Sequence, residues 1–430
     1  MRRIILFILI CILPLTALSA CYDAQEVTEW AYVYSIGMEK GVTDKLRMSV
    51  QIQTMKGGAG GGGQTDGGGK TNGEEKDGYV VITIDCPTFY AGVNMINSFL
   101  SRELNYMHTK FMVYSENLAK EGIDTYITAF IRGRQIRRDI NIIVSKGSAS
   151  EFLKASTTVV SAELSKKQEN LIQQSKNTGF FIDATYGDFI SALKTQYNQP
   201  VAILAAVNES STFREGEGTG EVPFKTSGDY YAGGLVRKGG SNVELLGTAL
   251  FDGGKMVGEL NGDETRAMLM ARGEFSRGFF AVRDPKKSDT TITVEVRKQR
   301  GRNVKVRFEK NKPVIDLKVF LEGDILAIQS TIDYEDKKLK PILENTVKDL
   351  IKNQLDRTIQ KCQRLNADVF KFGHVAAMSF DTIPQWEGYN WLKQFKDARV
   401  NTEVEFKVRR TGTMIKSSEI YTSEGKKGER

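Results

Sequence analysis

Histidine is almost absent from this sequence, which holds two in 430 residues, His108 and His374. Neither has a second histidine or a cysteine at the spacing of a metal-binding motif, so no His/Cys metal site is predicted. We expect His374, which follows Phe372 and Gly373, to be a packing or loop residue. The G-x-S-x-G motif that presents a hydrolase nucleophile is also missing. The sequence therefore predicts a protein that is not an enzyme and has no cofactor.

Cysteine is scarce as well, with four residues, Cys11, Cys21, Cys86 and Cys362. They are too few for a disulfide framework. Cys86 precedes Pro87 at the end of an expected strand, and Cys362 lies on the apolar side of an expected helix. We predict that both are free thiols in the core.

Long hydrophobic runs are missing after the opening MRRIILFILICILPLTALSAC. The run Ile4–Leu13 is shorter than the ~20 residues that a helix needs to cross a membrane core, and its flanks are those of a secretory signal peptide. Leu18-Ser19-Ala20 followed by Cys21 resembles the bacterial lipobox. The resemblance implies that 1–20 is a lipoprotein signal peptide cut between Ala20 and Cys21. Cys21 would then become an N-palmitoyl, S-diacylglyceryl cysteine, and its acyl chains would anchor the protein to a membrane. The alternative is an ordinary signal peptide followed by a chance cysteine.

No strongly basic block is visible, because the net charge of +7 is spread along the chain. The basic helices and aromatic-studded basic motifs of nucleic-acid-binding proteins are missing. A solvated surface is the simplest interpretation, and attraction to an anionic membrane surface is the alternative.

Glycine is concentrated in residues 57–73, GGAGGGGQTDGGGKTNG, which predicts a flexible loop. Gly69-Lys70-Thr71 resembles the end of a Walker A motif. Gln64 stands where that motif requires its first glycine, so nucleotide binding is not predicted.

The hydrophobic patterns predict an α+β fold class with three mixed α/β domains. The first, residues 21–207, alternates strands and helices and ends with a buried strand at 200–207. Residues 208–285 begin with a polar linker and form a small middle domain, in which Asp252-Gly253 indicates a hairpin turn.

The third predicted domain, residues 286–416, is an antiparallel sheet wrapped on one long helix. Its four strands, near 292–296, 304–308, 315–321 and 400–408, have alternating apolar residues and therefore one covered face. The helix is predicted from apolar residues that recur at helical spacing. They are Leu339, Leu343, Val347, Ile351, Leu355, Ile359 and Cys362. Residues 417–430 are expected to be a polar tail.

Several blocks, taken together, resemble the Ger(x)C family, the lipoprotein C subunits of nutrient germinant receptors in endospore-forming bacteria. The most characteristic is GTALFDGGKMVGELNGDETRAMLM, Gly247–Met270. The first block departs from the family pattern at Tyr22, where tryptophan is usual. In chain order the blocks are Cys21–Val27, Arg137–Gly147, Gly247–Met270, Ala367–Gly373, Pro384–Trp391 and Val408–Gly412.

The resemblance implies a non-enzymatic receptor subunit that is required for nutrient-triggered germination. It would be lipid-anchored through Cys21 on the outer face of the spore inner membrane, beside integral-membrane A and B subunits. A small-molecule germinant would act on it directly or through those partners. Gly247–Met270 and the third domain are the expected contact regions. Two alternatives stay open, a lipid-anchored solute-binding protein that captures the nutrient itself and an envelope or cortex hydrolase.

Overall fold

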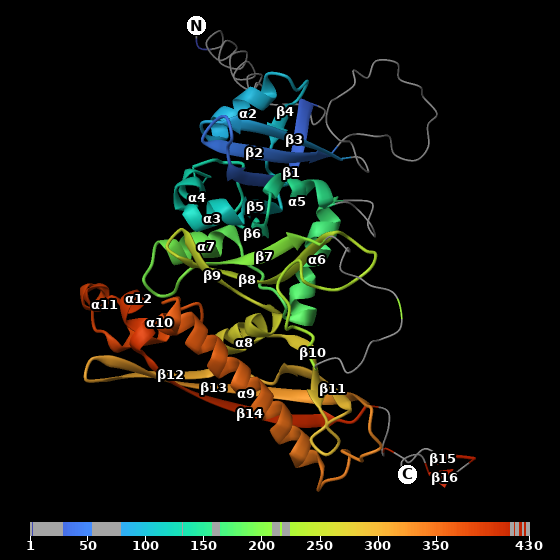
Figure 1. Ribbon diagram of the computed structural model, residues 1–430. Coiled ribbons are helices and arrows are strands. Elements are labelled where there is room, and N and C mark those ends of the chain that lie inside the picture. The colour runs from blue at the N-terminus through green and yellow to red at the C-terminus, as the bar shows by residue number, and fades with distance from the viewer. Residues whose placement is uncertain are drawn as a thin grey trace.

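The computed structural model describes residues 29–53, 79–130, 132–156, 164–208 and 224–412, together with 2, 216, 417, 421–423 and 425–426. Two large sheets dominate these residues. The N-terminal elements lie at one end of the molecule and the C-terminal sheet at the other (Figure 1).

The first sheet has nine strands. They are β1 (Trp30–Lys40), β2 (Leu46–Gln53), β3 (Tyr79–Cys86), β4 (Glu103–Asn105), β5 (Phe111–Ser115), β6 (Asn141–Lys146), β7 (Val201–Val207), β8 (Val243–Asp252) and β9 (Lys255–Leu260). Their spatial order is β3-β2-β1-β5-β6-β7-β8-β9, with β4 beside β1. The central strands β1, β5, β6 and β7 are parallel, and antiparallel pairs extend both edges.

Helices pack on both faces of this sheet. They are α2 (Phe89–Asn97), α3 (Glu116–Glu121), α4 (Asp124–Phe130), α5 (Ala149–Ala155), α6 (Leu164–Thr178) and α7 (Tyr186–Leu193). Phe111 and Val113 of β5 belong to the core that contains α5 and α6. Met112 and Tyr114 of the same strand belong to the core that contains α2, α3, α4 and α7. Parallel strands connected by helices are commonly buried on both faces in this way.

Local sequence accounts for where four of these helices begin. The hydroxyl of a serine or threonine accepts a hydrogen bond from a backbone N–H of the first turn, which supplies an acceptor that the helix lacks. The four capping residues are Thr88, Ser115, Ser148 and Thr185.

The first sheet continues past β7, where the sequence predicts its end. β8 pairs with β7, and β9 pairs with β8 through a turn in which Gly253 has φ 58°, as Asp252-Gly253 predicts. The next strand, Arg277–Arg283, belongs to the second sheet. Strands of the predicted middle domain, 208–285, are thus shared between two sheets. The domain boundaries themselves stay a prediction.

The second sheet has five strands. They are β10 (Arg277–Arg283), β11 (Thr291–Lys298), β12 (Asn303–Glu309), β13 (Lys312–Ile328) and β14 (Arg399–Arg410). The order β10-β11-β13-β12 is antiparallel throughout, as predicted. β14 instead runs parallel to β13, so the prediction of a wholly antiparallel sheet is wrong for this strand. A long helix connects β13 to β14 and returns the chain to the end where β13 begins, which is the usual route between parallel neighbours.

That helix is α9 (Lys340–Arg364), and it crosses one face of the second sheet (Figure 1). Its 25 residues span about 38 Å at 1.5 Å each. Pro341 lies in the first turn, where a missing N–H leaves no helical acceptor unpaired. The predicted apolar stripe begins at Leu339, which precedes the helix and is partly buried, and its members from Leu343 to Cys362 are buried against the sheet.

Short elements follow α9. They are α10 (Phe372–Ala376), η3 (Ala377–Ser379), α11 (Ile383–Tyr389), α12 (Trp391–Gln394) and η4 (Phe395–Asp397), and after β14 the pair β15 (Tyr421–Thr422) and β16 (Gly425–Lys426).

Two further predictions meet the structure here. Cys86 and Cys362 are free and buried, as predicted. The helical spacing of apolar residues from Thr88 to Leu104 predicts one helix over this segment. In the structure α2 ends at Asn97, and Leu104 is in β4, where its N–H donates to the Asn97 side chain. The glycine-rich loop 57–73 and most of 417–430 lie outside the described residues.

Candidate functional site

The predicted lipidation site, Cys21, and the cleavage residue before it, Ala20, lie outside the described residues. The first strand of the described fold, β1, starts nine residues after Cys21 in the sequence, at Trp30. Trp30 pairs with Glu103 of β4. These elements form the end of the molecule opposite the second sheet (Figure 1). Of the helices in the described part of the chain, none has the length and apolar content that crossing a membrane takes.

The characteristic stretch Gly247–Met270 contains the second part of β8, all of β9 and most of α8 (Gly262–Arg272). α8 lies between the two sheets and is buried along nearly its whole length. It begins with a capping box, in which Asn261 Oδ1 accepts from the Glu264 N–H and Glu264 Oε2 accepts from the Asn261 N–H. Residues of α8 share one core with both sheets. The stretch therefore joins the two halves of the fold, and little of α8 is left to contact a partner.

Arg266 is the charged centre of this joint and is 2% exposed. Its guanidinium lies 4.0 Å from the ring centre of Phe180 and 4.5 Å from that of Phe280. It donates to the Thr178 carbonyl at 2.7 Å and to the Phe279 carbonyl at 3.0 Å. These partners come from the end of α6 and from β10, so one side chain connects elements of both halves.

The acidic partner of Arg266 is Asp263, one helical turn earlier, with Nη1 and Oδ1 3.7 Å apart. Burial lowers the pKa of Arg266 to about 10, so the side chain stays cationic at neutral pH. Burial also raises the pKa of Asp263, although Thr226 donates to its carboxylate. This pair was not predicted from the sequence. Its signal is an acidic and a basic residue three apart within a mostly apolar segment.

A second ion pair connects α8 to α9. Lys361 Nζ lies 2.7 Å from Glu264 Oε2 and 3.1 Å from the hydroxyl of Tyr231. Burial acts to lower the pKa of Lys361, but these two contacts outweigh it and the pKa is raised. The joint is thus held by charged groups as well as by its core.

The block Ala367–Gly373 also has a structural explanation. Asp368 is fully buried and its carboxylate accepts from the Phe370, Phe372 and Gly373 N–H groups and from Trp391 Nε1. Burial raises the pKa of Asp368, and the four donors oppose that shift because they stabilise the carboxylate. Asp368 therefore organises the chain between α9 and α12.

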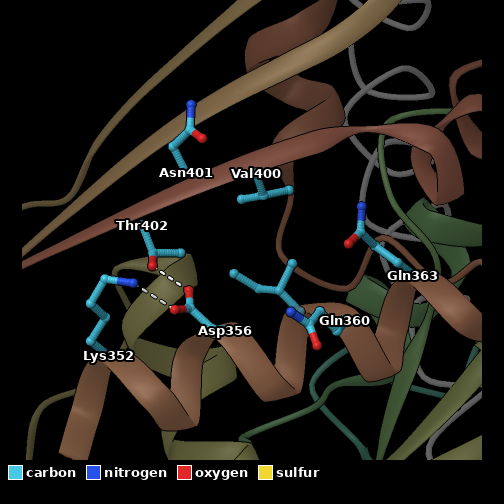
Figure 2. A pocket seen from close by; sticks show the side chains of 8 residues that line it. Lys352, Asp356, Gln360, Gln363, Val400, Asn401 and Thr402 are labelled. Carbon is cyan, nitrogen blue, oxygen red and sulfur yellow. Dashed lines mark hydrogen bonds and ion pairs between the residues drawn. The ribbon is translucent and has the colours of Figure 1, made fainter. Parts of the chain in front are cut away.

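A polar groove of about 380 Å³ lies between α9 and β14 (Figure 2). Asp356 accepts from Lys352 Nζ at 2.6 Å and from the Thr402 hydroxyl, so both of its oxygens are occupied. Gln360 and Asn401 supply further amides. The groove can form hydrogen bonds with a ligand, but it contains no histidine, cysteine or paired carboxylates that could act as acid, base or nucleophile.

Both histidines are exposed, and their rings pack on tyrosines, as predicted for His374. His374 stacks on Tyr197 with ring centres 4.9 Å apart, and its Nε2 is 3.0 Å from Asn198 Oδ1. Burial lowers the pKa of His374. His108 packs edge-to-face on Tyr32. Across the described ranges, no three His, Cys, Asp or Glu side chains gather into a group that could hold a metal ion.

Comparison with known proteins gives two family matches. Residues 23–207 match the family described as "Spore germination protein N-terminal domain". Residues 246–412 match the family described as "Spore germination B3/ GerAC like, C-terminal". The two matches follow one another and together cover most of the chain.

Individual relatives agree with these matches. The chain is 23% identical to YfkR of Bacillus subtilis (strain 168), over 96% of this chain and 98% of that protein. It is 22% identical to spore germination protein KC of the same organism, over 96% of each chain. The crystal structure of the GerBC protein aligns with 90% of this chain and 99% of its own, with a TM-score of 0.49 and 15% identity. With both halves matched and relatives similar over nearly their full length, this chain belongs to the Ger(x)C family of spore germination proteins.

Proposed function

We propose that this protein is the lipid-anchored, non-enzymatic C subunit of a nutrient germinant receptor. The observation that carries the proposal is the ordered match of both halves to the spore germination family, behind a lipobox that ends at Cys21. The relatives support a role in germination. The assembly with integral-membrane A and B subunits and the position on the outer face of the spore inner membrane belong to the proposal.

The described fold is consistent with a binding subunit. Three of its buried charged groups have structural partners: Arg266 and Asp263 lie in the joint between the two halves, and Asp368 holds the chain between α9 and α12. The α9–β14 groove offers hydrogen bonds and no acid–base pair. Anchoring would depend on the acylated cysteine, since two acyl chains at ~0.8 kcal/mol per buried methylene give a stable attachment.

The first experiment tests the anchor. Cys21→Ala is compared with Cys11→Ala, a matched control that removes a cysteine within the signal peptide and leaves Leu18-Ser19-Ala20-Cys21 intact. In wild type and in the control, mass spectrometry should find an acylated N-terminal peptide that starts at Cys21. Cys21→Ala should lack this peptide, and spores that carry it should lose most nutrient-triggered germination. An unmodified Cys21 in wild-type spores would refute the anchor.

The second experiment tests the assembly. Tagged wild-type protein is recovered from spore inner membranes in gentle detergent, and co-purified proteins are identified. Recovery of multi-spanning A and B subunits is the expected result. Recovery of the protein alone, under conditions that keep a known receptor intact, would count against the receptor proposal.

A further inference from the structure

Exposed apolar side chains are concentrated at the end of the fold where β1 begins. The described residues contain ten large hydrophobic side chains that are exposed, and four of them fall within 90–107. They are Tyr90 (47% exposed), Met95 (40%), Phe99 (60%) and Met107 (56%). They lie on α2, on the turn after it and on the turn after β4, which are neighbours in Figure 1. Exposed apolar clusters of this kind mark interaction surfaces.

A basic loop borders these side chains. The loop 132–138, RGRQIRR, follows α4, and Gly133 lies against the Tyr90 hydroxyl. Gln135 of the loop accepts from the Tyr106 N–H at 3.3 Å, next to Met107. The loop therefore meets the apolar cluster at Tyr90 and next to Met107.

The charge of this surface is positive and mostly unneutralised. Arg137 is paired with Asp139 at 2.9 Å. In the part of the chain that the structure describes, the other arginines of the surface have no ion pair. They are Arg102, Arg132, Arg134 and Arg138. Within 87–110 the one acidic residue is Glu103. We call the four apolar side chains and these four arginines the tip surface.

The tip surface lies near the start of β1, and this position restricts what it can contact. β4 runs parallel to β1, with Glu103 opposite Trp30, so Phe99 and Arg102 lie at the end of β1 where the chain enters the fold. Seven residues, 22–28, separate Cys21 from the described fold, and the eight Cα–Cα steps from 21 to 29 reach at most about 28 Å. An acylated Cys21 would thus hold the tip surface next to the lipid headgroups.

We propose that the tip surface is a second membrane contact, which lies on anionic lipid headgroups and sets the orientation of the fold; the proposal rests on the anchor at Cys21. Aromatic and methionine side chains enter the boundary between headgroups and acyl chains, and arginines attract the anionic headgroups. The second sheet would then point away from the membrane, because it lies at the opposite end of the molecule (Figure 1).

The lipid contact can be tested without the anchor. The mature chain with Cys21→Ser is mixed with vesicles of 30% phosphatidylglycerol in phosphatidylcholine, and the bound fraction is measured by sedimentation. We expect salt-sensitive binding that is absent from pure phosphatidylcholine. The fourfold change R102Q/R132Q/R134Q/R138Q should weaken binding at least tenfold. A fourfold control, K286Q/K305Q/K310Q/K312Q, removes the same charge from exposed positions near the second sheet and should leave binding unchanged.

The contribution of the apolar side chains of the tip surface is tested with a second variant and its matched control. F99S/M107S should weaken vesicle binding, whereas M378S/I383S, which alters two apolar residues elsewhere that are even more exposed, should not. Urea unfolding of each variant verifies that the fold is retained. Equal binding by the tip variants and their controls would overturn the proposal.

Orientation is tested with the lipidated full chain on the same vesicles. A fluorophore placed at F99C should be quenched by a headgroup-attached quencher, and one at M378C should not. If the protein is bound but F99C is not quenched, the tip contact is wrong and the anchor stands. If the lipidated protein does not bind at all, the anchor itself fails. If tip variants keep vesicle binding but lose co-purified membrane subunits, the surface binds protein and the lipid contact is overturned.

Discussion

The two sheets of this protein are covered differently, and the difference decides which residues matter. In β6 of the first sheet, Ile142 and Ile143 are both fully buried, because helices lie on both faces. In β13 of the second sheet, Leu317 is buried while its neighbour Lys318 is partly exposed. One face of the second sheet packs on α9 and the other meets solvent.

The solvent face of the second sheet carries a ladder of ion pairs. Arg297 binds Glu322 at 3.0 Å and Asp324 at 2.7 Å, and Arg409 binds Glu322 at 3.0 Å. Exposed pairs of this kind contribute little stability each. Substitutions should therefore be tolerated on the solvent face of the second sheet, and they should be destabilising on both faces of the first sheet.

The joint between the sheets should give the largest effect. Arg266→Ala leaves Asp263 buried without its cation and removes two hydrogen bonds to carbonyls, so we expect a loss of about 3–5 kcal/mol. Urea unfolding measures it. Arg277→Ala, an exposed arginine on β10, is the control and should cost less than about 1 kcal/mol. Equal stability of the two variants would mean that the joint does not couple the sheets.

Alanine substitutions at adjacent positions of one strand test directly whether one or both faces of each sheet are packed. Ile142→Ala and Ile143→Ala should each cost about 2–5 kcal/mol, because both side chains leave cavities in packed cores. Leu317→Ala should cost a similar amount, and Lys318→Ala should cost much less. The free energy of unfolding of all four variants decides the matter. A small cost at either isoleucine would show that one face of the first sheet is less well packed than its burial indicates.

The ion-pair ladder should give the smallest effect, and one that depends on pH. Hydrogen bonds from Arg297 lower the pKa of Asp324, so the folded state binds fewer protons than the unfolded state near the ordinary aspartate pKa of about 4. The stabilisation is present above that pH and is lost as the pH falls through the lowered pKa.

Arg297→Gln should therefore cost less than about 1 kcal/mol at pH 7 and less still at pH 3 or in 1 M salt. Urea midpoints at pH 7 and pH 3 measure this, with Lys305→Gln as the control. A cost that grows at low pH would contradict the assigned sign.

Much of the architecture could be predicted because its signal is local. Alternating residues such as Val294 and Val296 identify strands with one buried face, and the stripe from Leu343 to Cys362 identifies α9. Asp252-Gly253 identifies the β8–β9 turn. The parallel direction of β14 was missed, because alternation has the same period in both directions and only the route of α9 sets the direction.

The candidate sites divide in the same way. The lipidation site at Cys21 is predicted from a contiguous sequence motif, and it stays a prediction. Arg266 could not be ranked from sequence, because its partners Phe180 and Phe280 lie 86 and 14 residues away. The tip surface combines 90–107 with 132–138, and only the fold brings the exposed apolar side chains of the first segment beside the arginines of the second.

By itself, the sequence determined the family, the predicted lipobox, most strands and the long helix, since each is encoded in neighbouring residues or in a fixed period. The tertiary structure alone decided that β8 and β9 extend the first sheet, that α8 joins the two sheets and that a basic apolar surface lies near the start of β1. The physical reason is that these features depend on contacts between distant segments. Burial and pairing between such segments are set by the whole packed chain.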